Sequence, residues 1–356
     1  MDFTVDSEQR ALQQSVREMS SRVAPSQTAV GPGTYEPKAW SAMADLGLLA
    51  LPFAEEVGGA GASAAEVVLA SAELGRARLR SPYAESLAAT RILIDAGGEP
   101  QASLVADVVA GERLVVTAFA EPGRAWAPES PTVTAAEGAD GWTLTGAKGP
   151  VPYGEAAYAL VVNAATPHGP GLFLVEEPTV VDGMVVFEAT PATVLDAGAT
   201  EGALAAGLDL GLAALCGEAL GAMEAALGLT VDYLKARKQF GVPLMTFQTL
   251  TQRAADMYVS VELARSAVLF AGMAVTDSPD ADAAMSRVKV LVGRTGRHVA
   301  QESIQLHGGI GVTAEYAVGH HATRLTEIEH TLGDTRYHLA RLAAGLAGHT
   351  EVDVLA

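Results

Sequence analysis

Hydrophobic and polar positions in the first third of the chain repeat at helical spacing. The segment SEQRALQQSVREMSSRV (7–23) opens with a Ser and Glu pattern that suits a helix N-cap, and its apolar residues lie three and four positions apart. The segments KAWSAMADLGLLAL (38–51) and SAAEVVLASAELGRARL (63–79) continue this spacing, separated by a glycine-rich break. The pattern predicts an N-terminal α-helical domain over residues 1–113.

From residue 114 the pattern changes to short β-like runs bounded by Gly, Pro, Asp and Asn. These runs are RLVVTAFA (113–120), PTVTAA (131–136), GWTLTG (141–146), YALVVNA (158–164), GLFLVEE (171–177) and MVVFEAT (184–190). No segment of helical length separates them, so we expect an antiparallel sheet or small barrel rather than β-α-β units. Residues 114–202 are assigned to this central β domain.

Helical spacing returns after residue 203 and continues to the end of the chain. Four long segments follow one another with short connections: 211–240, 247–275, 281–306 and 334–348. Such segments predict a C-terminal four-helix bundle over residues 203–356. The expected fold class is therefore α+β with several domains: α-helical, then antiparallel β, then a helix bundle.

Composition excludes several classes of partner and site. The formal net charge of −19 argues against nucleic acid, because a phosphate backbone requires a basic face. Cys216 is the only cysteine, so an internal disulfide is impossible and no thiolate metal cluster is predicted. We expect Cys216 to be a small buried apolar residue and the protein to be cytoplasmic, with no metal site.

The longest apolar stretch, residues 203–229, has the length of a membrane span. It is interrupted by Asp209, Glu218 and Glu224, which would be unfavourable in a bilayer, and it is rich in Ala and Gly. We therefore expect a buried helix with tightly packed neighbours and no membrane span. The N-terminus MDFTVDSEQR lacks the basic and apolar parts of a signal peptide.

The glycines of LHGGIGVTAEY (306–316) raise the question of a phosphate-binding loop. A dinucleotide-binding GxGxxG loop follows a strand and begins a helix, whereas these glycines follow a predicted helix and the third glycine is missing. A simple helix C-cap and turn would also use glycine here. Taken alone, the motif favours the turn.

Two segments together resemble the acyl-CoA dehydrogenase family: YLKARKQFGVPLMTFQTLTQRAADM (233–257) and QLHGGIGVTAEYAV (305–318). The segments MDFTVDSEQRAL, LGLLALPFAEEVGGAGAS and AFAEPG lie at that family's usual places. The resemblance covers essentially the whole chain and implies the same three domains. It also implies FAD held between subunits of a tetramer and thioesters of CoA as substrates.

The resemblance assigns residues of both segments to the ADP half of FAD, bound mainly by a neighbouring subunit. These residues are Arg237, Gln239, Phe240, Gln248, Gln305, Gly308 and Gly309. The chemistry suits that role, because an arginine neutralises pyrophosphate, an aromatic ring packs, and a glycine allows close backbone approach.

Family catalysis requires a carboxylate that removes the α-proton of the thioester while the flavin accepts a hydride from the β-carbon. An ungapped count from GGIGVTAEY places this base at Leu332, and leucine cannot accept a proton. The alternative family position, four residues before Tyr233, is Leu229. Asp232 is a weak substitute on the same helical face.

Three further acids precede or follow Leu332. We expect Glu327 and Glu329 to be exposed to solvent on a connecting segment, and Asp334 to cap the final helix. The sequence therefore offers no catalytic carboxylate at the expected place.

A second departure affects the part of the family fold that lies against the flavin ring. The family pattern K-x-aromatic-I-T-N-G reads KGPVPYG (148–154), with Pro150 and Pro152 in place of an aromatic residue and a threonine. Proline donates no backbone hydrogen bond. The stretch after the EP pair, usually rich in Ser or Thr, reads GRAWAPES (123–130). The half that would hold this chain's own flavin ring is thus altered, and the half that reaches a neighbour's FAD is kept.

This division suggests that the chain is the base-less subunit of a heteromeric acyl-CoA dehydrogenase, that is, the subunit that lacks the catalytic carboxylate. Enzymes of this kind, known from actinobacterial steroid side-chain degradation, are α₂β₂ heterotetramers in which a homologous subunit carries the base. The reaction implied is α,β-desaturation of a bulky acyl thioester. One alternative is a self-sufficient flavoenzyme with a relocated base such as Asp232, or with different chemistry, as in acyl-carrier-protein dehydrogenases and flavin oxidases. The second alternative is a scaffold protein that binds no flavin, although Arg237, Phe240 and Gln305 argue against it.

Overall fold

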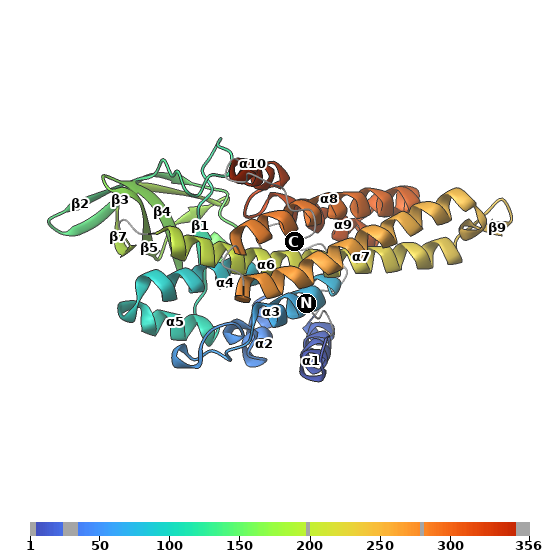
Figure 1. Ribbon diagram of the computed structural model, residues 1–356, viewed down its shortest axis with the longest axis horizontal. Coiled ribbons are helices and arrows are strands. Elements are labelled where there is room, and N and C mark those ends of the chain that lie inside the picture. Colours follow the sequence, from blue (N-terminus) through green and yellow to red (C-terminus); the bar gives the residue numbers. More distant parts are fainter. Residues whose placement is uncertain (1–4, 24–34, 197–199, 278–280, 347–356) are drawn as a thin grey trace.

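The structure is a computed structural model that describes residues 5–23, 35–196, 200–277 and 281–346 (Figure 1). Helices form the first part of the chain, a sheet forms the second, and helices form the third. Figure 1 shows the sheet at one end of a long helical body and the small β8–β9 hairpin at the opposite end. The predicted fold class is confirmed.

The described residues of the N-terminal part form five α-helices, which pack below the long helices of the body in Figure 1. They are α1 (Ser7–Val23), α2 (Pro37–Asp45), α3 (Ala64–Arg76), α4 (Tyr83–Ile92) and α5 (Ala102–Val109). Helix α1 is capped one residue earlier than its Ser and Glu pattern predicts, because the Asp6 carboxylate accepts the Gln9 N–H at 2.8 Å. Helix α3 begins with a capping box formed by Ser63 and Glu66.

The sheet has seven strands, which are antiparallel with one main exception. They are β1 (Val115–Ala118), β2 (Thr134–Gly138), β3 (Gly141–Lys148), β4 (Ala159–Thr166), β5 (Gly169–Glu176), β6 (Val180–Val181) and β7 (Met184–Asp196). Strands β1 and β4 pair in parallel, from Val115 opposite Ala159 to Ala118 opposite Val162. The prediction of an antiparallel sheet was therefore wrong for the pairing of β1 with β4. The chain between these two strands forms the β2–β3 hairpin, which provides the crossover connection that parallel strands need in place of an α-helix.

The C-terminal part contains the helix bundle. Its elements are α6 (Glu201–Ala236), β8 (Lys238–Gln239), β9 (Val242–Pro243), α7 (Gln248–Asp277), α8 (Ala281–His307), α9 (Ala317–His330) and α10 (Thr335–Gly345). The bundle is confirmed, but its fourth member is α9, and the predicted fourth helix, α10, packs against α8. Helix α9 escaped prediction because its buried face includes the polar residues His321 and Glu329, which interrupt the apolar periodicity.

Helix α6 is the central helix, and small residues allow its neighbours to approach closely. A side chain at Gly221 would overlap the carbonyl oxygen of Ala72 on α3, and one at Gly217 would meet Val68. Cys216, which directly precedes Gly217, is fully buried, and burial raises the pKa of its thiol to about 11. The predicted tight packing of a buried helix is confirmed.

Among the described residues, two helices, α6 and α7, are long and apolar enough to cross a membrane by length and composition alone. Most of the apolar window of α6 is buried inside the structure, as in the core helix of a folded domain. Less of α7 is buried, and its exposed apolar residues include Tyr258, Val259 and Leu263. This exposed apolar face of α7 therefore lacks a cover within the part of the chain that the structure describes.

The first strand begins at Val115 and helix α6 begins at Glu201, close to the predicted domain boundaries. The division into domains 1–113, 114–202 and 203–356 stays a prediction. The ends of the first and third predicted domains, 1–4 and 347–356, lie outside the described residues.

Candidate functional site

The residues that the sequence assigns to the ADP half of FAD gather at the hairpin end of the bundle. Helix α6 ends there, with Arg237 as its C-cap, and α8 ends there at His307. The ring of Tyr233 stacks on that of His307 at 4.5 Å between centroids, and Tyr316 contacts both rings. The aromatic cluster thus joins the two sequence motifs at one end of the molecule.

The side chains of these residues point away from the core. All seven are exposed: Arg237, Gln239, Phe240, Gln248, Gln305, Gly308 and Gly309. Phe240 is 91% exposed and has a left-handed backbone, with φ of 53°, which is unfavourable for an aromatic residue. Within the described residues, the Arg237 guanidinium forms no ion pair. An exposed ring beside an unpaired cation fits a ligand or subunit from outside the chain.

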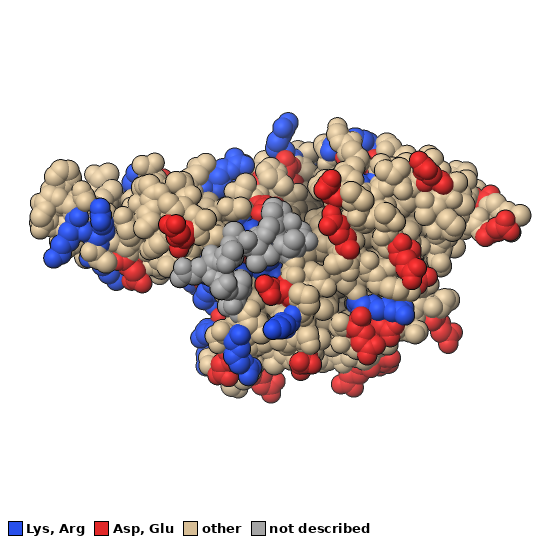
Figure 2. All heavy atoms as spheres, turned by 180° about the vertical axis from the view of Figure 1, so that it is seen from behind, with Lys and Arg blue, Asp and Glu red and all other residues tan. Residues whose placement is uncertain are grey.

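Basic side chains add to this picture. Figure 2 shows Asp and Glu interspersed with Lys and Arg over the face opposite to that of Figure 1, and blue atoms gather toward the hairpin end. Lys235, Arg237 and Lys238 are exposed in that part of the chain. In a protein with a net charge of −19, a local basic group at one end favours an anionic group there.

The two glycines that follow α8 have different reasons to be glycine. Gly308 has φ of +65°, where any side chain is strained. Gly309 has an ordinary backbone, and a Cβ atom there would meet nothing within 4 Å. The packing of this chain therefore explains Gly308 but not Gly309, and open space at Gly309 fits the close approach of an outside group.

We expect substitutions at these two glycines to separate folding from binding. Gly308→Ala should lower the free energy of unfolding by about 1 kcal/mol, since it forces a left-handed alanine. Gly309→Ala should change it by less than about 0.5 kcal/mol, as for an open surface site. Urea denaturation of both variants measures the difference, and equal losses would contradict this assignment.

The predicted base position, Leu332, lies at the other end of α9, between the three parts of the fold. It is 5% exposed and has a left-handed backbone, and its carbonyl oxygen accepts a hydrogen bond from His338 Nε2 at 3.1 Å. A Cβ atom on Gly211 of α6 would lie 3.1 Å from Leu332 Cδ1. The side chain therefore packs against α6, and no carboxylate occupies this position.

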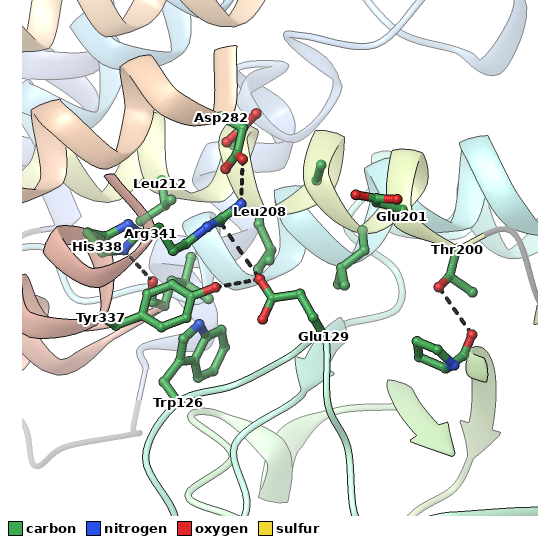
Figure 3. Close-up of a pocket in the computed structure, with 15 residues that line it drawn as sticks. Trp126, Glu129, Thr200, Glu201, Leu208, Leu212, Asp282, Tyr337, His338 and Arg341 are labelled. Atoms are coloured by element: carbon green, nitrogen blue, oxygen red, sulfur yellow. Dashed lines mark hydrogen bonds and ion pairs between the residues drawn. The ribbon is translucent and has the colours of Figure 1, made fainter. Parts of the chain in front are cut away.

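Two cavities meet at Leu332, which lines both of them together with Trp126. The first, here called the Glu85 cavity, has a volume of about 360 Å³, and its lining includes Glu85, Phe119, Pro150, Pro152, Tyr153 and Arg324. The second, here called the Arg341 cavity, has a volume of about 300 Å³ (Figure 3). The same two residues line both, so they lie where the two cavities adjoin.

The sequence departures near the expected flavin ring all border the Glu85 cavity. Pro150 and Pro152 line it after strand β3, and Trp126 lines it from the loop after β1. That loop is held by Glu121, whose carboxylate accepts hydrogen bonds from Lys148 Nζ at 2.8 Å and from the Thr132 N–H at 2.7 Å. These partners lower the pKa of Glu121 despite its desolvation, which acts in the opposite direction.

The Arg341 cavity has an apolar floor from α6 and an acidic wall. Figure 3 shows Tyr337, Glu129 and Arg341 pointing toward one another: the Tyr337 hydroxyl donates to Glu129 Oε1 at 2.6 Å, and Arg341 pairs with Asp282. Burial and the nearby charge of Asp282 raise the pKa of Asp209 to about 7. The excess of carboxyl groups over one arginine makes this cavity unsuitable for a phosphate group.

The neutral imidazole ring of His338 holds the backbone at Leu332 in place. Its Nε2 donates to the Leu332 carbonyl oxygen and its Nδ1 accepts from the Ser286 hydroxyl, both at 3.1 Å. Burial lowers the pKa of His338 to about 4. Protonation therefore favours the unfolded chain between about pH 6.5 and pH 4, and the contribution to stability falls as the pH is lowered through that window.

We expect this histidine to produce a measurable pH dependence. Between pH 6.5 and pH 5 it should lower the free energy of unfolding by about 1.5 kcal/mol, a loss that a His338→Gln variant does not share. Chemical denaturation at both pH values, for the wild type and the variant, gives the difference in slope. Equal slopes for the two proteins would contradict this account.

Glu327 and Glu329 are not solvent-exposed residues of a connecting segment, as the sequence suggested. Both lie in helix α9: Glu327 pairs with Arg80 at 2.8 Å, and Glu329 is 6% exposed and accepts the Thr335 N–H at 3.1 Å. The prediction was wrong because α9 was not recognised as a helix. Asp334 caps α10 as predicted, by accepting the Tyr337 N–H at 2.8 Å.

Leu229 and Asp232 lie far from the cavities. Leu212 of α6 lines the Arg341 cavity, and Leu229 and Asp232 follow it by 17 and 20 residues on the same helix. At 1.5 Å per residue, they lie about 25 and 30 Å farther along the axis. Asp232 and Leu229 therefore lie away from the site around Leu332, and their assignment as alternative base positions stays a prediction.

The structure also reveals a buried charge network that sequence reasoning missed. Arg324 forms two hydrogen bonds with Glu218, at 2.6 and 2.8 Å, and contacts Glu327 at 3.4 Å. Glu85, at the first turn of α4, is 3% exposed, and burial raises its pKa to about 7, against the opposing effect of Arg324. Nothing in the pattern of α4 marks Glu85, because α4 is covered by elements distant in the sequence, among them α6 and β1.

Comparison with known proteins identifies relatives along almost the whole chain. Residues 6–112 match the family model "Acyl-CoA dehydrogenase, N-terminal domain", and residues 202–347 match "Acyl-CoA dehydrogenase, C-terminal domain". The acyl-CoA dehydrogenase FadE27 of Mycobacterium tuberculosis is 29% identical over 88% of this chain and 89% of its own length. The acyl-CoA dehydrogenase IpdE2 of Mycolicibacterium smegmatis is 30% identical over 87% of this chain and 88% of its own.

Solved structures show the same fold. A variant of the Tcur3481–Tcur3483 steroid acyl-CoA dehydrogenase is 32% identical, with a TM-score of 0.87 over 97% of this chain and 99% of that one. The ChsE4–ChsE5 complex of Mycobacterium tuberculosis, at 24% identity, has a TM-score of 0.87 over 99% of this chain and 100% of that one. The second likeness concerns the fold alone.

Proposed function

The chain belongs to the acyl-CoA dehydrogenase family, and from this premise we propose that it is the base-less subunit of a heteromeric enzyme. The assembly would desaturate a bulky acyl thioester between its α- and β-carbons. The observation that carries the proposal is Leu332: an apolar, buried side chain stands where the resemblance places the proton acceptor. A subunit with this residue depends on a partner for the base.

The residues shared by the two cavities support the same proposal. Leu332 and Trp126 line both cavities, so two bulky apolar side chains lie where the cavities adjoin, beside the expected position of the base. Pro150 and Pro152 remove backbone donors beside the Glu85 cavity. Each departure weakens a complete site within this chain.

The hairpin end supports a role in binding FAD together with a partner. FAD supplies the hydride acceptor of the reaction when it is bound. Arg237 would neutralise its pyrophosphate, and Phe240 and the open position at Gly309 would contact its ADP half, together with Gln239, Gln248, Gln305 and Gly308. All of these groups face away from this chain's core, as expected if most of the cofactor belongs to another subunit.

A homologous subunit is the partner that the surface favours. The exposed apolar face of α7 has no cover within the described residues, and an apolar face of this kind is typical of an interface. The 32% identical steroid acyl-CoA dehydrogenase carries a name that joins two proteins. We accordingly propose an α₂β₂ assembly that acts in lipid or steroid degradation, in the cytoplasm, where the single buried cysteine stays reduced.

Activity measurements test this proposal. The chain should be expressed alone and together with a base-bearing acyl-CoA dehydrogenase encoded beside it, and each preparation assayed with acyl-CoA thioesters and an artificial electron acceptor. We expect turnover from the mixture only. Full turnover by the single chain would overturn the proposal.

A second candidate function, a self-sufficient flavoenzyme with a relocated base, is favoured by one observation. Glu85 is a buried carboxyl group in the cavity that Leu332 lines, and its pKa of about 7 suits a general base. If the single chain turns over acyl-CoA, Glu85→Gln should abolish that activity. Activity that survives this substitution would remove Glu85 from consideration as a base.

A further inference from the structure

The Glu85 cavity contains a buried carboxyl oxygen that has no partner. Glu85 is 3% exposed, and its Oε2 atom forms no hydrogen bond with any described residue. An oxygen of this kind is unusual, because buried polar atoms are nearly always paired, and leaving one unpaired is unfavourable. Glu85 also lines a cavity of about 360 Å³, within the size range of small-molecule sites.

The rest of the cavity lining comes from the central and C-terminal parts of the chain, and apolar side chains form much of it. Phe119 and Trp126 come from the segment after β1, Tyr153 from the segment after β3, and Leu332 from the turn after α9. These side chains form the apolar part of the lining. The polar residues Glu121, Arg324, Glu327 and Thr331 also line the cavity, but they already have hydrogen-bond partners within the chain, unlike Glu85 Oε2. This combination is typical of pockets that hold an apolar molecule by a single polar end.

The charges around the cavity are balanced, which argues for an uncharged ligand. Arg324 is satisfied by Glu218 and Glu327, so it has no free charge for a ligand carboxylate. The charged groups that line the cavity or pair with its lining are equally acidic and basic: Glu85, Glu121, Glu218, Glu327, Arg80, Arg124, Lys148 and Arg324. A ligand with a net charge would disturb this balance in a buried place.

We propose that the Glu85 cavity binds a neutral, apolar molecule that donates a hydroxyl hydrogen bond to Glu85 Oε2. A hydroxyl group suits this site in either state of the carboxyl group, because it donates to the ionised form and accepts from the protonated form. The ligand class is thus an aliphatic or alicyclic alcohol. The inference goes beyond the proposed function, since it concerns binding within this chain and requires neither flavin nor turnover.

Binding of 1-octanol and methyl octyl ether to the purified full-length protein tests the proposal by calorimetry at pH 8. The two probes share their alkyl chain, but only the alcohol can donate. At this pH the carboxyl group, with its pKa near 7, is mainly ionised. We expect the alcohol to bind the wild type at least about tenfold more tightly than the ether, as for a hydrogen bond to a charged group.

Two variants and a control separate the role of Glu85 from general changes in the protein. Glu85→Leu should reduce the preference for the alcohol to less than about threefold. Glu85→Gln, which keeps the shape and one acceptor oxygen, should retain a reduced preference and provides the test if the leucine variant does not fold. Asp209→Asn alters a similarly buried carboxyl group in the Arg341 cavity, and it should leave the preference unchanged.

Three results would overturn the proposal. They are equal affinity of the wild type for the two probes, no binding of the alcohol, and a preference that survives in both Glu85 variants. None of them depends on the flavin content or activity of the protein, so this test and that of the base-less subunit can fail separately.

Discussion

Replacing Arg324 by leucine is expected to lower the free energy of unfolding by about 3–5 kcal/mol. The Arg324 side chain holds two hydrogen bonds to Glu218 and contacts Glu327, and its charge lowers the pKa of Glu85 against the effect of burial. Its loss would leave three carboxyl groups in or beside a buried site without their shared cation. Removing one member of a buried ion pair is far more damaging than removing both.

Urea denaturation at pH 7 measures this loss, with Arg91→Leu as the matched control. Arg91 pairs with Asp95 one helical turn away at 2.7 Å, but both side chains are partly exposed, so its removal should change stability by about 0.5 kcal/mol or less. A double variant, Arg324→Leu with Glu218→Leu, should recover part of the lost stability. Similar losses for Arg324→Leu and Arg91→Leu would contradict the role given to the buried network.

Changing Arg237 or Phe240 is expected to remove flavin from the assembled enzyme without unfolding this chain. Arg237→Gln removes the unpaired guanidinium, and the dissociation constant for FAD should rise about tenfold to a hundredfold, as for a lost charge-assisted hydrogen bond. Phe240→Ala removes a ring that is 91% exposed, so it should also weaken FAD binding. Neither change should shift the free energy of unfolding by more than about 0.5 kcal/mol.

Flavin absorbance after dialysis measures the occupancy of each assembled variant. Arg336→Gln is the matched control, because Arg336 is also an exposed arginine that forms no ion pair within the described residues, but it lies on α10, away from the hairpin end. It should retain the wild-type FAD content. If all three variants lose flavin equally, the effect is one of general charge, and the assignment of Arg237 fails.

Local sequence patterns predicted the order of helices and strands because most elements bury one face. The β runs are separated by turn residues, and the high Ala and Gly content of the segment that forms α6 indicated a buried helix. Helix α9 was missed because polar side chains occupy its buried face, where both His321 and Glu329 are buried. The parallel pairing of β1 with β4 depends on how a hairpin returns the chain, and no local pattern encodes that.

The residues of the candidate site also differ in whether a local sequence pattern could reveal them. Arg237, Phe240 and Gly309 could be named as candidates because they lie in short contiguous motifs, and the structure brings these motifs together. Trp126, Glu85 and Arg324 come from distant segments, so their shared cavity depends on tertiary packing. The count that led from the glycines to Leu332 reached a buried position between two cavities, whereas the count from Tyr233 reached the opposite end of α6.

The ratio of bound FAD to polypeptide tests the central claim most directly. The chain purified alone should be nearly colourless, and its complex with a base-bearing homologous subunit should contain one FAD for every two chains. Quantification of released flavin against protein by absorbance and amino-acid analysis gives both values. One FAD per chain in the homo-oligomer, with desaturation of an acyl-CoA, would contradict the account.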